Sequence, residues 1–92
     1  MNKIEGKIMS KEDFLYNATY TKEPYEGIMV SSDSKNNQYK IAVQLSENQV
    51  LVVDQVSDRE VQERLHQWVP RVNEIQMQYG VKNDLENYSS KY

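Results

Sequence analysis

Residues 58–80 read DREVQERLHQWVPRVNEIQMQYG, and this stretch decides the fold. At about 100° per residue on a helical wheel, six apolar side chains share one stripe about 80° wide. The stripe keeps its phase across Pro70, which lies on the opposite side of the wheel. Two independent helices would have no reason to preserve that phase, so we predict one helix that bends at Pro70 and ends at Gly80. The stripe consists of Val61, Leu65, Trp68, Val72, Ile75 and Tyr79.

The alternative for this stretch is a break near Trp68, with Pro70 as the first residue of a second helix. The start of the helix carries a capping-box pattern, with Ser57 at the cap and Glu60 three residues later. We therefore expect the helix to begin directly after Ser57.

Three segments before the helix are typical of strands: residues 27–31, 38–45 and 49–56. Within residues 38–45 the apolar residues alternate, which places Tyr39, Ile41, Val43 and Leu45 on one face. Residues 50–53 form an unbroken apolar run, so both faces of that strand should be covered. We expect the long helix on one face, and an N-terminal helix or a partner on the other. The simplest arrangement is a three-stranded antiparallel meander.

The N-terminal part of the chain predicts a short helix. Ser10 is a plausible cap with Asp13 three residues on, and a helix over residues 11–20 would end before Pro24. Residues 1–9 fit an arm or a short strand, and residues 81–92 a frayed helix or a tail. The fold class we predict is α+β, in a single domain of residues 1–92. It has a short N-terminal helix, a three-stranded antiparallel sheet and a long Pro-kinked C-terminal helix packed on the sheet.

Composition excludes several classes of protein. The chain has 92 residues, no cysteine and a net charge of −3. Cysteine chemistry and disulfides are therefore excluded, and direct nucleic-acid binding is disfavoured because Lys and Arg are scattered singly. No apolar run approaches the roughly 20 residues that span a bilayer, and the N-terminus lacks the apolar core of a secretory signal. We expect a cytoplasmic protein that does not bind membranes.

Catalytic and metal-binding patterns are missing from the sequence. His66 is the only histidine and falls outside the apolar stripe, where a surface role is the simplest interpretation. A single histidine with scattered acids has no zinc or calcium spacing. Three glycines form neither a nucleophile elbow nor a phosphate loop. We expect no enzymatic activity, no catalytic residue, no cofactor and no metal.

Acidic residues gather around the junction between the last strand and the long helix. The simple interpretation is a solvated helix face whose first acids complement the helix dipole, because Arg59, Arg64 and Arg71 interleave with them. The sharper hypothesis is a surface that imitates nucleic-acid phosphates, since acids three or four apart on a helix lie about 5–6 Å from each other. The candidate partner-binding residues are Asp54, Asp58, Glu60, Glu63, Glu74, Asp84 and Glu86.

The seven tyrosines, at positions 16, 20, 25, 39, 79, 88 and 92, suggest a different use. Tyrosine is favoured at protein interfaces, because its ring is apolar and its hydroxyl is polar. A small structural or assembly subunit that forms a homo-oligomer through its tyrosines and helix face is therefore the alternative function. Trp68, at the centre of the stripe, is expected to anchor the core.

Eight Lys, eight Asn, seven Tyr and five Ile in a small acidic chain, from MNKIEGKIMSKEDF to LENYSSKY, resemble the early proteins of T-even phages. Among these the chain looks like the Arn family of antirestriction proteins. That resemblance implies a non-enzymatic DNA mimic in the host cytoplasm that occludes a host DNA-binding protein or restriction nuclease. A charge of −3 is small for this purpose, so the resemblance also implies a homodimer that aligns acids from two subunits.

Overall fold

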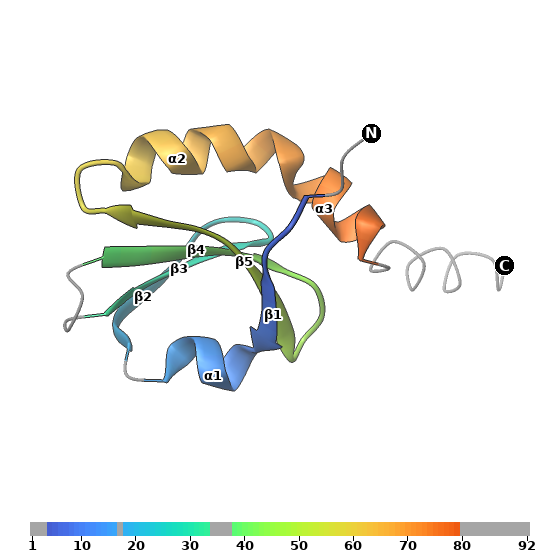
Figure 1. The fold of residues 1–92 in the computed structure, drawn as a ribbon, viewed down its shortest axis with the longest axis horizontal. Helices are drawn as coiled ribbons and strands as arrows, with labels where there is room; N and C mark the ends of the chain where they lie inside the picture. The colour runs from blue at the N-terminus through green and yellow to red at the C-terminus, as the bar shows by residue number, and fades with distance from the viewer. Residues whose placement is uncertain (1–3, 17, 34–37, 80–92) are drawn as a thin grey trace, which may run out of the picture.

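The residues that the structure describes form an antiparallel sheet of five strands with helices on both faces (Figure 1). A computed structural model describes residues 4–16, 18–33 and 38–79. The strands lie in the order β1-β5-β4-β3-β2, so β1 and β2 form the two edges. The strands are β1 (Lys7–Ser10), β2 (Ala18–Tyr25), β3 (Ile28–Asp33), β4 (Gln38–Gln44) and β5 (Gln49–Ser57). The helices are α1 (Lys11–Leu15), α2 (Val61–Trp68) and α3 (Val72–Gln78), with a 3₁₀ turn, η1 (Val69–Arg71), between the last two.

The expected three-stranded sheet is wrong, although the α+β class holds. The meander β3-β4-β5 corresponds to the three strands read from the sequence, but β1 adds to β5 and β2 adds to β3. The expected helix over residues 11–20 is also wrong, because α1 ends at Leu15. Ser10 does cap it by accepting a hydrogen bond from the Asp13 amide at 3.0 Å. The residues that follow pair with β3 instead, as suits the β-branched and aromatic run Thr19, Tyr20 and Thr21.

The strand pair β4–β5 contains a bulge that decides which way Asp54 points. Ala42 pairs with Val52 and Ile41 with Asp54, so Val53 is an extra residue in β5. The extra residue shifts the alternation of side chains by one position. After it, Asp54 and Val56 share the face of Leu51, the same face on which the long helical segment lies. Without the bulge Asp54 would point to the opposite face.

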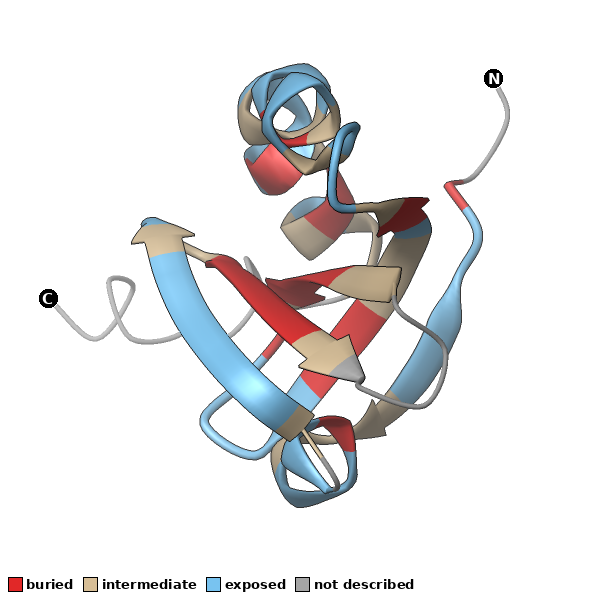
Figure 2. Ribbon diagram, turned by 90° about the vertical axis from the view of Figure 1, so that its left-hand side faces the viewer, coloured by how far each residue is buried: buried red, intermediate tan, exposed pale blue. Residues whose placement is uncertain are grey.

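The apolar core is split by the sheet into two clusters. The larger cluster lies under the helical segment and confirms the apolar stripe: Leu65, Val72 and Ile75 are buried in it, and the other three stripe residues pack against it. The smaller cluster lies on the opposite face of the sheet, between the sheet and α1, which is the helix at the bottom of Figure 2. It consists of Phe14, Met29, Ala42 and Val50, with Met9 and Val52 packed against it. The prediction that both faces of residues 50–53 are covered is therefore confirmed.

The C-terminal helical segment lies between the two alternatives drawn from the sequence. The α-helix ends at Trp68, and Pro70 sits in the first positions of the 3₁₀ turn, yet the turn runs directly into α3. Proline has no backbone N–H to donate, and the 3₁₀ turn accommodates this missing hydrogen bond while the chain continues in the same direction. The expected start is wrong, because α2 begins at Val61 rather than after Ser57. The Ser57 hydroxyl donates to the Glu60 carboxylate at 3.2 Å and caps no amide. Gly80, the expected last residue, lies outside the described residues.

Candidate functional site

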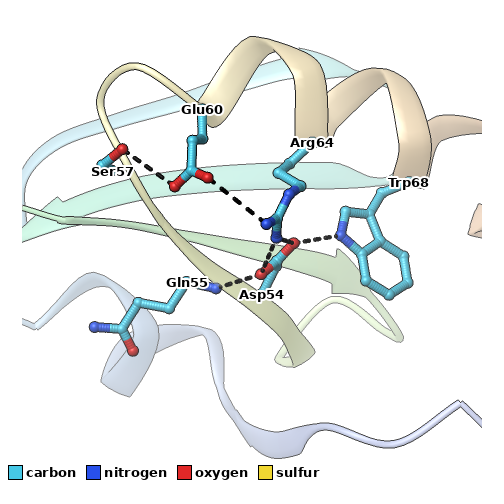
Figure 3. Close-up of polar contacts among 6 residues, drawn as sticks. All are labelled: Asp54, Gln55, Ser57, Glu60, Arg64 and Trp68. Carbon is cyan, nitrogen blue, oxygen red and sulfur yellow. Dashed lines mark hydrogen bonds and ion pairs between the residues drawn. The ribbon is translucent and has the colours of Figure 1, made fainter.

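Asp54 is the centre of a polar cluster that ties β5 to α2 (Figure 3). Its carboxylate accepts hydrogen bonds from Arg64 Nη1, at 2.9 and 3.1 Å, and from the Trp68 indole nitrogen at 2.9 Å. The Gln55 amide donates to it at 2.9 Å. Arg64 also approaches the Glu60 carboxylate at 3.8 Å. Because the Asp54 side chain is only 16% exposed, this cluster fixes the helix on the sheet more than it presents charge to a partner.

The pKa of Asp54 reflects that role. Burial alone would raise the pKa of its carboxyl, but the hydrogen bonds from Trp68, Arg64 and the Gln55 amide outweigh burial and hold the pKa below its ordinary value. The same pair raises the pKa of Arg64, through the hydrogen bond and the negative charge of Asp54. Both groups therefore stay charged at neutral pH, and neither is poised to exchange a proton.

The acids proposed from the sequence do not form one continuous surface. Asp54 is enclosed by its donors, and Glu74 faces Arg71 at 3.4 Å. The start of α2 keeps Asp58, Glu60 and Glu63 exposed, with Glu60 close to Arg64. Asp84 and Glu86 lie outside the described residues. Among the described acids, the accessible part of the proposed acidic surface is thus the three carboxylates at the start of α2.

A hollow opens on the other flank of α2, between the helix and the edge strand β2. Its volume is about 220 Å³. Its lining is mixed, with aliphatic, charged and amide side chains and two tyrosine rings. The hollow is lined by Tyr20, Lys22, Pro24, Val30, Tyr39, Asp58, Val61, Gln62 and Leu65. We call it the β2–α2 cleft.

Aromatic side chains continue along the same flank of the helix. The rings of Tyr20 and Tyr39 meet edge to face with centroids 6.4 Å apart, and Tyr25 meets His66 in the same way at 6.3 Å. Tyr20 and Tyr25 are 48% and 38% exposed, which leaves both within reach of a partner. His66 therefore lies on the surface as expected, beside an aromatic ring. This arrangement is typical of binding surfaces rather than of catalytic sites.

Tyr39 is connected to the acid at the start of the helix. The negative charge of Asp58, and a hydrogen bond between the two side chains, raise the pKa of the Tyr39 hydroxyl. The Tyr39 hydroxyl therefore stays protonated at neutral pH. Tyr39 and Asp58 both line the cleft.

The β2 edge itself is protected against pairing with another strand. Among the described residues β2 pairs only with β3, and it is exposed along nearly its whole length (Figure 2). However, Pro24 has no amide to donate, the strand carries Lys22 and Glu23, and its register with β3 shifts twice. Proline, charges and bulges are the usual means of blocking strand addition. A partner is therefore expected to use side chains at the cleft and not the strand backbone.

The residues that β2 contributes to the cleft were missed by reasoning from the sequence. The sequence predicts that Tyr20 lies in a helix and that Lys22 and Pro24 belong to the segment that closes this helix. The sequence does contain a signal for the strand, since two threonines flank Tyr20 and the strand ends before the Glu26-Gly27 turn. The cleft itself depends on where α2 lies over the sheet, which the periodicity of one helix does not specify.

Neither the described residues nor known proteins provide a further functional assignment for the chain. In the part of the chain that the structure describes, no helix combines the length and apolar character needed to cross a bilayer. Nor do three or more His, Asp or Glu side chains of these residues gather in a group that could hold a metal ion. No protein-family model matches the chain, and neither a curated protein nor a solved structure resembles it significantly. The resemblance to the Arn family thus stays a prediction.

Proposed function

We propose that the protein is a non-enzymatic binding protein that acts in the cytoplasm by covering the working surface of a partner protein. The observation that carries the proposal is the β2–α2 cleft, with the exposed Tyr20 and Tyr25 beside it. Exposed tyrosines next to a hollow that is lined by both apolar and polar side chains supply the anchors and pockets from which interface hot spots are built. The mechanism is occlusion and needs no bond-making step.

The second candidate is the phosphate mimic suggested by the acidic residues. The observation in its favour is that Asp58, Glu60 and Glu63 stay exposed together at the start of α2. In this version the partner is a host DNA-binding protein or nuclease, and its basic groove supplies the attraction. The ion pairs of Asp54 and Glu74 reduce the number of carboxylates that can take part. A homodimer would restore a longer acidic surface, and sedimentation equilibrium measures whether one forms.

One experiment separates the two candidates. The tagged protein is incubated with bacterial lysate, and retained proteins are eluted in parallel with duplex DNA and with salt. Two variant sets are compared with the wild type: Tyr20→Ser with Tyr25→Ser, and Asp58→Asn with Glu60→Gln and Glu63→Gln. Both sets change exposed side chains and leave the buried core intact.

We expect a specific partner that the tyrosine set loses and that moderate salt does not release. A partner that DNA displaces, that salt releases and that the acid set loses would replace the first candidate with the mimic, because attraction between exposed charges is screened. Equal retention of every protein by wild type and both variant sets would contradict both candidates. The remaining alternative would then be an assembly subunit that recognises only its own copies.

A further inference from the structure

We infer that the β2–α2 cleft receives one neutral aromatic side chain of the partner protein, a tryptophan or a tyrosine, whose N–H or O–H donates to Asp58. The inference rests on the proposed function, because it specifies what the covered partner inserts. Three properties of the cleft lead to it: its volume, the charges at its rim and the rings in its wall.

The volume restricts the occupant to a single side chain. At about 220 Å³ the cleft falls below the about 300–1,000 Å³ of pockets that enclose drug-sized molecules. Val30, Val61 and Leu65 contribute apolar surface to its lining beside the polar groups, so a side chain with both an apolar body and a polar atom fits it. A partner surface that presents one large side chain meets both conditions.

The charges around the cleft favour a neutral occupant. Lys22 and Asp58 both line it, so the repulsion that an inserted charged side chain meets from one of them offsets the attraction of the other. A charged side chain therefore gains no net attraction to offset the loss of its water. Tyr20 and Tyr39 are the other titratable groups that line the cleft, and the raised pKa of Tyr39 keeps its hydroxyl neutral at physiological pH. A neutral side chain avoids the cost of removing a charge from water. One that carries a hydrogen-bond donor can also bond the Asp58 carboxylate, whose two oxygens offer several acceptor sites.

The tyrosine rings favour an aromatic occupant over an aliphatic one. The planes of Tyr20 and Tyr39 stand at 75° to each other, so the wall offers both a ring face and a ring edge. A third ring can stack on one and meet the other edge to face, the arrangements that aromatic pairs prefer. The Lys22 ammonium can then lie over the inserted ring, as cations do at aromatic faces. Tryptophan and tyrosine combine such a ring with a donor that stays neutral across the physiological pH range, whereas histidine gains a positive charge within that range.

The test uses the free protein and isolated side-chain probes. N-acetyl-tryptophanamide is titrated into the ¹⁵N-labelled protein, and amide shifts are mapped on β2 and on the start of α2. Its 1-methylindole analogue, which has the same ring but no N–H, is the matched control. The leucine, arginine and glutamate derivatives of the same form test the other classes of occupant. Asp58→Asn and Tyr20→Ala, both at exposed positions, complete the set.

We expect tryptophanamide to shift the amides of Tyr20, Lys22 and Gln62, and the methylated analogue to bind about 12- to 160-fold more weakly, the factor for one hydrogen bond to a charged group. In Asp58→Asn the difference between the two probes should shrink, because a neutral amide accepts less strongly. No shift at the cleft, or stronger binding of the leucine, arginine or glutamate probe, would overturn the inference. The titration contains no partner protein, so its result is independent of the lysate capture. If the probe binds but the capture retains no specific partner, the proposed function is refuted and the inference stands. If a partner is captured but the probe does not bind, the inference alone is refuted.

Discussion

Replacing Asp54 with alanine tests whether the polar cluster holds α2 on the sheet. The variant leaves the indole N–H of half-buried Trp68 without its acceptor, which costs about 1–3 kcal/mol. It also removes the ion pair with Arg64. Since the Arg64 side chain is 34% exposed and keeps Glu60 nearby, this loss adds about 1 kcal/mol. We therefore expect the free energy of unfolding to fall by about 2–4 kcal/mol, a large part of the total for a domain of this size.

The assay is urea unfolding, followed by tryptophan fluorescence and by far-ultraviolet circular dichroism. Trp68 is the only tryptophan, so its fluorescence reports this contact directly. Asp54→Asn keeps an acceptor for the indole and should lose only about 1 kcal/mol. Glu74→Ala removes an ion pair between more exposed side chains and should change stability by less than about 0.5 kcal/mol. An Asp54→Ala variant as stable as Glu74→Ala would refute the reasoning.

The same cluster predicts how stability depends on pH. The folded state lowers the pKa of Asp54 below its ordinary value of 3.8. The carboxylate thus stabilises the fold fully above pH 3.8, and this contribution is lost as pH falls through the lowered pKa. The stability gap between wild type and Asp54→Asn should be constant at neutral pH and should close only in that acidic range. A gap that closes near pH 6 would assign the effect to another group.

Three further predictions concern the turn, the bulge and the rim of the cleft. Gly27 has a φ of +85°, and an added Cβ would lie 3.0 Å from a side chain of α3, so Gly27→Ala should lower stability by about 1–3 kcal/mol in urea unfolding. Deleting Val53 removes the extra residue of the bulge. Asp54 then follows Val52 directly and still points to the face of the sheet on which α2 lies. The deletion should therefore cost little more than Val53→Ala and should preserve a cooperative transition. In Asp58→Asn the pKa of Tyr39 should fall towards its ordinary value, as measured by NMR titration of labelled tyrosine.

The sequence predicts those elements that a local pattern specifies. It does not predict an element that forms only by pairing with a distant segment. The stripe from Val61 to Tyr79 and the alternation in β4 are local patterns, and both faced the core as expected. The edge strand β2 was missed because its residues are exposed and show no apolar period. These residues form a strand because they pair with β3, and the local sequence of residues 11–20 contains no information about that pairing. Helix propensity around the Ser10 cap extends only as far as Leu15.

The candidate site was predicted less well than the fold, for a related reason. Charge in the sequence placed Asp54 on an accessible acidic surface, but the bulge at Val53 turned it towards Trp68. One extra residue reverses the face of every side chain that follows, and no composition or charge pattern reveals it. Tyrosine content did suggest an interface, yet which tyrosines gather at one place followed from the position of β2.

The bulge and the cleft are two consequences of where the helical segment lies on a five-stranded sheet. The bulge turns the Asp54 side chain towards α2. Asp54 then accepts hydrogen bonds from Arg64 and Trp68, which fix one flank of α2 to β5. With that flank fixed to β5, one helix is too narrow to cover the distant strand β2 as well. The uncovered strip beside Tyr20 is the β2–α2 cleft. The contact that stabilises one side of the helix therefore keeps the other side open, so loosening Asp54 should alter probe binding at the cleft although Asp54 does not line it.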